Sequence, residues 1–265
     1  MQITTKGVVL RDRELSNDSR LLTILTKERG VLHAFARPAK KLGGMAAATE
    51  FLSYSNFVLF QSKERYTVDK ADSERIFFQL RQDLDQLSLA SYLAELLIEL
   101  GPEQEDAGEY LSLFLNCLHL METKKRPVEQ IKPLFELRLL SMTGYMPDLV
   151  GCQGCGTFCG EKNYFSPQQG CFYCQNCLPP SGEGLVPLSC DQLAALRHIL
   201  YSDSKTLFQF RMSAAGLEQL GRITERYLKT QLGRTFASLD FYHSIHLPAS
   251  GMPPEPENAR TQKGE

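Results

Sequence analysis

The sequence lacks the marks of an exported, membrane-bound or strongly charged protein. Charged side chains interrupt the first fifteen residues, so the hydrophobic region of a signal peptide does not fit there. The most apolar stretch, residues 87–100, contains two serines and two glutamates and falls short of the roughly 18 apolar residues that span a membrane. The 29 basic and 31 acidic side chains nearly cancel, leaving a formal net charge of -2. We therefore expect a cytoplasmic protein with no membrane partner.

The motifs of several common enzyme classes are also missing. The chain has no G-x4-G-K-[ST] phosphate loop, no G-x-G-x-x-G after a strand and no G-x-S-x-G nucleophile motif. The five histidines are scattered along the sequence, and each is more often a structural or surface side chain than a general base. Nucleotide hydrolysis and α/β-hydrolase chemistry therefore lack their usual motifs in this sequence.

The chain is long enough for more than one module, and its charge is unevenly distributed. Its 265 residues exceed the usual size of one domain, while 43% hydrophobic and 23% charged residues are typical of folded proteins. Residues 1–45 hold nine basic and four acidic side chains, whereas residues 81–150 hold six basic and twelve acidic ones. A basic module that binds a polyanion is therefore compatible with the small net charge.

Residues 1–80 have the pattern of a small β-barrel. Short segments rich in β-branched and aromatic residues are separated by turn residues, which predicts five strands. The expected strands are Ile3 to Leu10, Leu21 to Thr26, Val31 to Ala36, Leu52 to Phe60 and Tyr66 to Val68. An OB-fold is the economical candidate because it is a five-stranded barrel that commonly binds nucleic acid. Other small β-domains share these counts.

Residues 81–247 have the apolar spacing of helices, interrupted by a cysteine-rich module at about 150–180. Asp106 with Glu109, and Ser189 with Gln192, have the spacing of capping boxes and predict two helix starts. Another helix is expected to begin near Pro127 or Pro133. Residues 248–265, which contain four prolines, are predicted to be a disordered tail. The expected class is thus α+β and multidomain.

The cysteine module has the spacing of a structural zinc site. Two C-x2-C pairs lie eighteen residues apart, as in zinc ribbons, and they comprise Cys152, Cys155, Cys174 and Cys177. Gly154 and Gly156 are expected to ease the first turn by adopting positive φ. Four thiolates would complete the coordination of one Zn²⁺ ion and leave no position for a catalytic water. A redox-active iron centre of the rubredoxin kind is the less favoured alternative.

The remaining cysteines leave a choice of second pair. Cys171 and Cys174 are also a C-x2-C pair at a permitted separation from Cys155, so spacing alone does not decide. A hairpin turn over 165–170 favours Cys174 and Cys177, which leaves Cys159 and Cys171 as spare thiols. In a reducing cytoplasm disulfides are not expected. Cys117 and Cys190 are predicted to be small core residues.

The basic side chains of the barrel are the main functional signal. Lysines and arginines neutralise phosphates, and aromatic side chains offer stacking surfaces for bases. The candidate DNA contacts are Lys6, Arg11, Arg13, Arg20, Arg37, Lys40 and Lys41, with Phe35, Tyr54, Phe57 and Tyr66 as candidate stacking residues. An ordinary solvated surface around a barrel core is the alternative interpretation of these residues.

The combination of local motifs resembles the RecO family of bacterial recombination mediators. The residues from Lys6 to Arg11, Ser19 to Thr23 and Thr26 to Gly30 look like the first strands of that family. The residues from Leu139 to Pro147 and from Gly170 to Cys177 are similar to its approach to the zinc module and its second half, and Arg234 to Leu239 fits its ending. The resemblance covers residues 3 to about 245.

The resemblance implies a function in DNA repair and recombination without turnover of a small substrate. It implies an OB-fold domain, a helical domain with a zinc finger, binding of single- and double-stranded DNA, and strand annealing. It also implies association with the nucleoid and partnership with RecR and the single-strand binding protein SSB, with RecF as a further candidate. A zinc-stapled interaction scaffold that does not touch DNA is the alternative.

Overall fold

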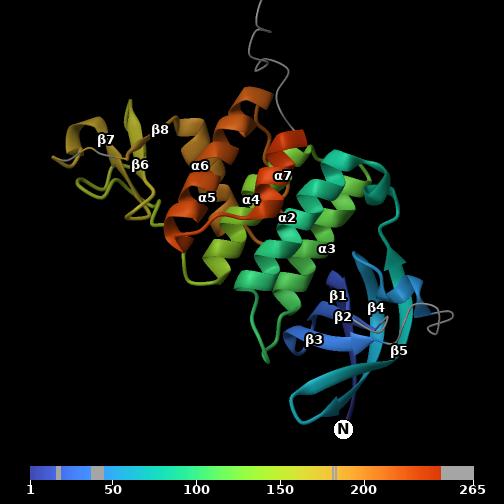
Figure 1. Ribbon diagram of the computed structural model, residues 1–265. Coiled ribbons are helices and arrows are strands. Elements are labelled where there is room, and N and C mark those ends of the chain that lie inside the picture. The colour runs from blue at the N-terminus through green and yellow to red at the C-terminus, as the bar shows by residue number, and fades with distance from the viewer. Residues whose placement is uncertain (16–18, 37–44, 181, 183, 246–265) are drawn as a thin grey trace, which may run out of the picture.

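The computed structural model describes residues 1–15, 19–36, 45–180, 182 and 184–245. A β-barrel and a small three-stranded sheet lie at opposite ends of a group of helices (Figure 1). Within the described residues no helix is both long and apolar enough to cross a membrane. The predicted tail at 248–265 lies outside the described residues.

The barrel consists of five strands and is closed, in the order β1-β2-β3-β5-β4. The strands are β1 (Gln2–Glu14), β2 (Arg20–Thr26), β3 (Gly30–Ala36), β4 (Ser53–Ser62) and β5 (Arg65–Ile76), with a 3₁₀ turn, η2 (Ala47–Thr49), before β4. All pairs are antiparallel except β3 with β5. The prediction of an OB-like barrel is therefore confirmed, although β5 is much longer than the expected three residues.

Alternation along the strands separates the barrel interior from its outer surface. Val9, Ile24 and Leu32 are aligned across β1, β2 and β3 and belong to the cluster inside the barrel. Their neighbours Val8 and Leu25 point outward and join the core of the helical part instead. One end of the β1–β3 outer surface is therefore covered by helices, because successive side chains of a strand point to opposite faces.

Within the part of the chain that the structure describes, six helices form the middle of the molecule and share one hydrophobic core. They are α2 (Leu84–Leu100), α3 (Gly108–Glu122), α4 (Val128–Met142), α5 (Cys190–Tyr201), α6 (Ala214–Leu232) and α7 (Ala237–Ile245), and a 3₁₀ turn, η3 (Gln79–Gln82), precedes α2. Helix α4 packs on α6, and α7 packs on α2. The last helix was not expected from the sequence pattern.

The helix starts test the predicted caps. Ser189 and Gln192 form the predicted capping box at the start of α5. The predicted box of Asp106 and Glu109 is wrong: Asp106 accepts a hydrogen bond from the backbone N–H of Gly108, two residues on, and α3 begins after Ala107 without a side-chain cap. Helix α4 begins directly after Pro127.

The barrel is joined to the helices through the loop between α2 and α3. The N–H of Val31 donates to the carbonyl of Pro102 over 2.8 Å, and Gln104 N–H donates to Arg29 at 3.0 Å. Gly30 lies here with a φ of +64°, and a Cβ atom at this position would come within 1.9 Å of the Pro102 carbonyl oxygen. Only glycine allows this approach of the two backbones.

The chain between α4 and α5 forms the metal module (residues 148–188). Its sheet has the order β7-β6-β8 and consists of β6 (Asn163–Ser166), β7 (Cys171–Cys174) and β8 (Val186–Leu188), with the 3₁₀ turn η4 (Gln175–Cys177) after β7. Ser166 pairs with Cys171, which confirms the predicted hairpin. Gly170 turns the chain with a φ of +63°.

Candidate metal centre and nucleic-acid surface

Four cysteine sulfurs meet at one end of the metal module. The Sγ atoms of Cys152, Cys155, Cys174 and Cys177 all lie within 4.8 Å of one another. Cys152 and Cys174 are buried, whereas Cys155 is exposed. These are the four residues that the sequence pattern selects, and their sulfur atoms converge as ligands of one ion would.

Backbone hydrogen bonds hold the first pair of cysteines in a tight loop. The N–H of Cys152 donates to the carbonyl of Thr157, and the N–H of Gly156 donates to the carbonyl of Cys152. Gly156 has the predicted positive φ of +73°. Gly154 serves a different purpose from the one predicted: a Cβ atom there would lie 2.6 Å from the Cβ atom of Cys177. Glycine at 154 lets the two cysteine pairs approach each other.

The second pair is set by the end of β7. Cys174 is the last residue of the strand, its N–H donates to the Cys152 sulfur at 3.2 Å, and η4 then returns Cys177 to the cluster. Cys171 and Cys174 are three residues apart in one strand, so their side chains point to opposite faces. Cys171 is buried away from the four sulfurs, with its Sγ 3.6 Å from Gln169 Oε1.

The four sulfurs fit a tetrahedral metal ion. A tetrahedron with metal–sulfur distances of about 2.3 Å has edges of about 3.8 Å, and the Cys155 and Cys174 sulfurs are 3.7 Å apart. Hydrogen bonding to Thr157 lowers the pKa of Cys155 to about 6, whereas hydrogen bonding with Cys155 raises the pKa of Cys177 to about 12. A cation among the four sulfurs would favour the thiolate form of each cysteine. Four close cysteines can hold a metal ion here.

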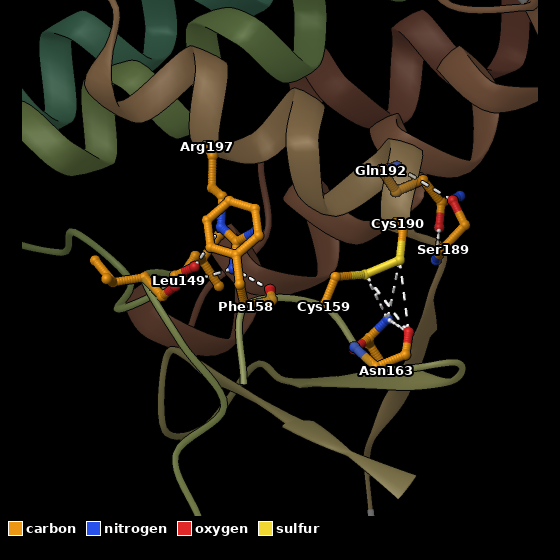
Figure 2. The surroundings of a disulfide bond; sticks show 10 residues. Leu149, Phe158, Cys159, Asn163, Ser189, Cys190, Gln192 and Arg197 are labelled. Atoms are coloured by element: carbon orange, nitrogen blue, oxygen red, sulfur yellow. Dashed lines mark hydrogen bonds between the residues drawn. A yellow bond between two sulfur atoms is a disulfide. The ribbon is translucent and has the colours of Figure 1, made fainter. Parts of the chain in front are cut away.

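Among the other cysteines, the prediction fails for Cys159 and Cys190. Cys117 is buried in α3 as predicted, and burial raises the pKa of its thiol. Cys159 and Cys190 are joined by a disulfide across 31 residues of sequence (Figure 2). The prediction of a spare thiol at 159 and a core residue at 190 is therefore wrong, because Cys190 is the exposed first residue of α5.

The residues predicted to contact DNA lie in different environments: one is buried, one forms an exposed ion pair and two are exposed on β1. Arg20 points into the barrel end, where its side chain is only 6% exposed and its Nε donates to Asp12 Oδ1 at 2.9 Å. Lys6 is exposed and forms an ion pair with Glu74 at 2.9 Å. Arg11 and Arg13 are exposed on β1. The predicted contacts Arg37, Lys40 and Lys41 lie outside the described residues.

The four aromatic residues predicted to stack on bases also differ in how far they are buried. Phe57 is fully buried inside the barrel, so the expectation that it offers a stacking surface is wrong. Tyr54 packs against the helical core and Tyr66 against the barrel core, and both are half-buried. Phe35 is 38% exposed.

Arg11 and Arg13 lie on an open part of the barrel that we call the β1–β3 outer face. Strand pairing aligns Arg11 with Thr23 and His33 in one row, and Arg13 with Leu21 and Phe35 in the next. Among the residues that the structure describes, neither arginine forms a salt bridge. The sequence prediction missed His33, although its spacing of two from Phe35 puts both on one face of a strand.

Comparison with known proteins matches almost the whole chain to one family. Residues 1–77 match the family described as Recombination protein O N terminal, and residues 81–240 match Recombination protein O C terminal. The chain belongs to the RecO family. The recognition made from the sequence motifs is therefore confirmed, and DNA repair is the process to which this family is assigned.

Three curated relatives cover most of the chain. The DNA repair protein RecO of Acetivibrio thermocellus is 33% identical over 92% of this chain and 97% of its own length. The RecO proteins of Symbiobacterium thermophilum and Alkaliphilus metalliredigens are 31% and 30% identical, over 90% and 92% of this chain and 96% and 100% of their own lengths. The similarity thus includes the barrel, the helices and the metal module.

Proposed function

We propose that this RecO protein is a recombination mediator that binds single- and double-stranded DNA and anneals complementary strands. The observation that carries the proposal is the β1–β3 outer face, where Arg11 and Arg13 stand beside His33 and Phe35. Arginines neutralise phosphates without reading sequence, while an exposed aromatic ring stacks on a base of any kind. OB-folds commonly bind nucleic acid on this face. Arg37, Lys40 and Lys41 follow β3 in the sequence and would extend the basic surface.

Arg20 is left out of the proposed contact surface. Its guanidinium is engaged by Asp12 and by Thr49, whose side-chain and backbone oxygens accept hydrogen bonds at 3.0 and 2.9 Å. A phosphate could reach it only by breaking these contacts. Lys6 remains a candidate whose positive charge is partly neutralised by Glu74.

We infer that the metal is one structural Zn²⁺ ion held by Cys152, Cys155, Cys174 and Cys177. Zinc is the usual ion of closed four-thiolate sites, and such an ion contributes folding free energy. This closed coordination agrees with a mediator that changes the arrangement of strands without catalysing a reaction. Iron in the same four thiolates would give visible charge-transfer absorption, which metal analysis and spectroscopy distinguish.

The helical part is the proposed contact for protein partners. Its segment from 81 to 150 carries twice as many acidic as basic side chains and would repel a DNA backbone. RecR and SSB, and RecF as a further candidate, are therefore proposed to bind away from the β1–β3 outer face. In this proposal the protein acts in the cytoplasm, at the nucleoid.

The binding test compares matched pairs of arginines. Fluorescence anisotropy of labelled single strands should give a log affinity that falls linearly with log salt, by about 0.7 per phosphate contact. Arg11→Gln with Arg13→Gln should weaken binding and flatten that slope. Arg211→Gln with Arg226→Gln removes the same charge from exposed positions of the helical part and should change neither. Unchanged binding in the first pair would remove this face from the site.

The mediator test measures strand annealing. Complementary strands coated with SSB should pair faster when this protein is added, without nucleotide and without cleavage of DNA. A groove that is indifferent to sequence lowers the repulsion between two backbones and leaves the bases free to pair. If the protein binds bare strands but coated strands anneal at the spontaneous rate, the mediator proposal fails. Absence of any DNA binding at low salt would favour the interaction scaffold.

A further inference from the structure

Two side chains of α5, Arg197 and Cys190, hold the segment of the metal module that contains Phe158 and Cys159. Arg197 and Cys190 are seven residues apart, which is about two helical turns. Figure 2 shows both side chains directed from α5 toward the segment that contains Phe158 and Cys159. This segment is thus fixed to α5 by the contacts of one arginine and by one disulfide.

Arg197 forms the attachment that does not depend on redox state. Its Nε donates to the carbonyl of Leu149 at 2.6 Å, and one Nη donates to the carbonyls of Val150 at 3.1 Å and Phe158 at 2.6 Å. The guanidinium also stacks on the Phe158 ring, 3.6 Å from its centre. Because Phe158 directly precedes Cys159, these contacts fix Cys159 next to α5 whether or not its sulfur is bonded.

The two cysteines are placed for reversible bonding. Their Cα atoms are 6.1 Å apart, within the range of disulfides. Cys190 is exposed, whereas Cys159 is half-buried. Asn163 donates through Nδ2 to the Cys159 sulfur at 3.3 Å and lies 3.8 Å from the Cys190 sulfur. An external reagent therefore reaches Cys190 first, and Cys159 is close enough to react second.

The pair is also adjacent to the metal ligands. Asn163 pairs with Cys174 across β6 and β7. A Cβ atom at Gly160 would lie 3.0 Å from the Cβ atom of Cys174, so the chain after Cys159 runs along a ligand. If the segment from Cys159 to Asn163 separated from α5, the residues that pack against Cys174 would be held less firmly.

We propose that Cys159 and Cys190 are an oxidative modification site that takes low-molecular-weight disulfides and locks the metal module onto α5. The Cys190 thiolate attacks the external disulfide RSSR, forming Cys190–S–S–R and releasing RS⁻. The Cys159 thiolate then displaces the second RS⁻ and forms the protein disulfide, while the two thiol protons leave with the two RSH molecules. An excess of RSH reverses both steps. Phe165 and Pro167 keep the rest of the module packed on α6 in either form, through Tyr227 and Gln231. In the dithiol form Arg197 holds the segment at Phe158 and Cys159 on α5, and the disulfide adds a covalent bond there.

The chemical test uses the full-length protein, reduced, saturated with Zn²⁺ and treated with oxidised glutathione. Peptide mapping should find the Cys159–Cys190 bond and four unmodified ligand cysteines. Cys159→Ser should retain glutathione on Cys190, whereas Cys190→Ser should remain largely unmodified. Cys171→Ser, which changes another cysteine of the module, should form the bond as the parent does. Glutathione that stays on Cys190 in the parent, or a bond to any ligand cysteine, would overturn the proposal.

The functional test measures transfer of Zn²⁺ to a chromogenic chelator. Transfer should be several-fold slower from the disulfide form than from the dithiol form of the parent, because the wall of the site is locked. The same oxidant should leave the rate from Cys190→Ser unchanged. Equal rates from both forms of the parent would show that the bond does not lock the module. Neither readout involves DNA, so the outcome is independent of the proposed mediator function.

Discussion

Arg20 of β2 and Asp12 of β1 form an ion pair at the inner end of the barrel, where Thr49 of η2 completes the hydrogen bonds of the guanidinium. The Arg20 side chain is only 6% exposed, whereas that of Asp12 is 25% exposed. The three residues belong to three separate segments, β1, β2 and η2, so their contacts fix the position of η2 against the strands. A cation in this position stabilises the barrel and is not offered to solvent.

Arg20→Ala is therefore expected to lower the free energy of unfolding by about 2–3 kcal/mol, because it leaves the Asp12 carboxylate and the Thr49 oxygens without their partner. Chemical denaturation measures this loss. Arg13→Ala, an exposed change on the neighbouring strand, should alter stability by less than about 0.5 kcal/mol. Comparable losses in the two variants would contradict the structural assignment of Arg20.

The metal ligands are tested by single substitutions at sulfur. Cys152→Ser, Cys155→Ser, Cys174→Ser and Cys177→Ser should each lose the metal and fold poorly, because the ion contributes folding free energy. Cys171→Ser should retain the metal. Metal content and thermal denaturation are the measurements. Full metal content in Cys177→Ser together with loss in Cys171→Ser would transfer the site to the other C-x2-C pair.

A glycine variant tests the close approach of the two pairs without removing a ligand. Gly154→Ala places a Cβ atom 3.0 Å from the Cys177 sulfur and 2.6 Å from its Cβ, so metal affinity should fall. Gly221→Ala is the matched control because nothing lies within 4 Å of its Cβ position in α6. That control should gain roughly 0.5–1 kcal/mol of stability. A competition titration with a chelator distinguishes the two variants.

The buried ion cluster between α4 and α6 predicts a dependence of stability on pH. Burial alone would raise the pKa of Glu225, but Lys132 at 2.9 Å, Lys229 and His243 together outweigh it and lower that pKa from 4.5 to about 2. A lowered carboxyl pKa in the folded state stabilises the protein above pH 4.5, and this contribution is lost as the pH falls toward 2. Allowing for solvent screening, the contribution is of the order of 1–2 kcal/mol.

Glu225→Gln should remove that part of the acid dependence when stability is measured between pH 2 and 5. Glu218→Gln, on the same helix in an exposed ion pair with Arg222, should leave the dependence nearly intact. A parallel loss in both variants would show that the buried cluster is not its source.

The sequence predicts those features that depend on local chemistry. The capping box at Ser189 and the turn before Gly170 were predictable because each uses neighbouring residues. The alternation of side chains along β2 also indicates that Arg20 points inward. Arg20 shares its face of β2 with Leu22 and Ile24, which are both buried in the barrel. The count of basic residues does not distinguish such an inward-pointing arginine from the exposed ones.

Features that depend on distant segments could not be predicted in the same way. The bond between Cys159 and Cys190 depends on the position that Arg197 gives to Phe158, and no spacing rule encodes that contact. The purpose of Gly154 likewise depends on Cys177, which is distant in sequence and close in space. Local patterns therefore select the four cysteines whose sulfurs converge, whereas the contacts that support them depend on the fold.

The junction at Gly30 fixes the orientation of the barrel relative to the helices. Backbone hydrogen bonds from the β2–β3 hairpin to the loop before α3 leave no flexible tether between barrel and helices. A strand of DNA held on the β1–β3 outer face would therefore keep a fixed angle to the helices. A protein bound to the helices would then stay at a constant distance from the DNA bound to the barrel.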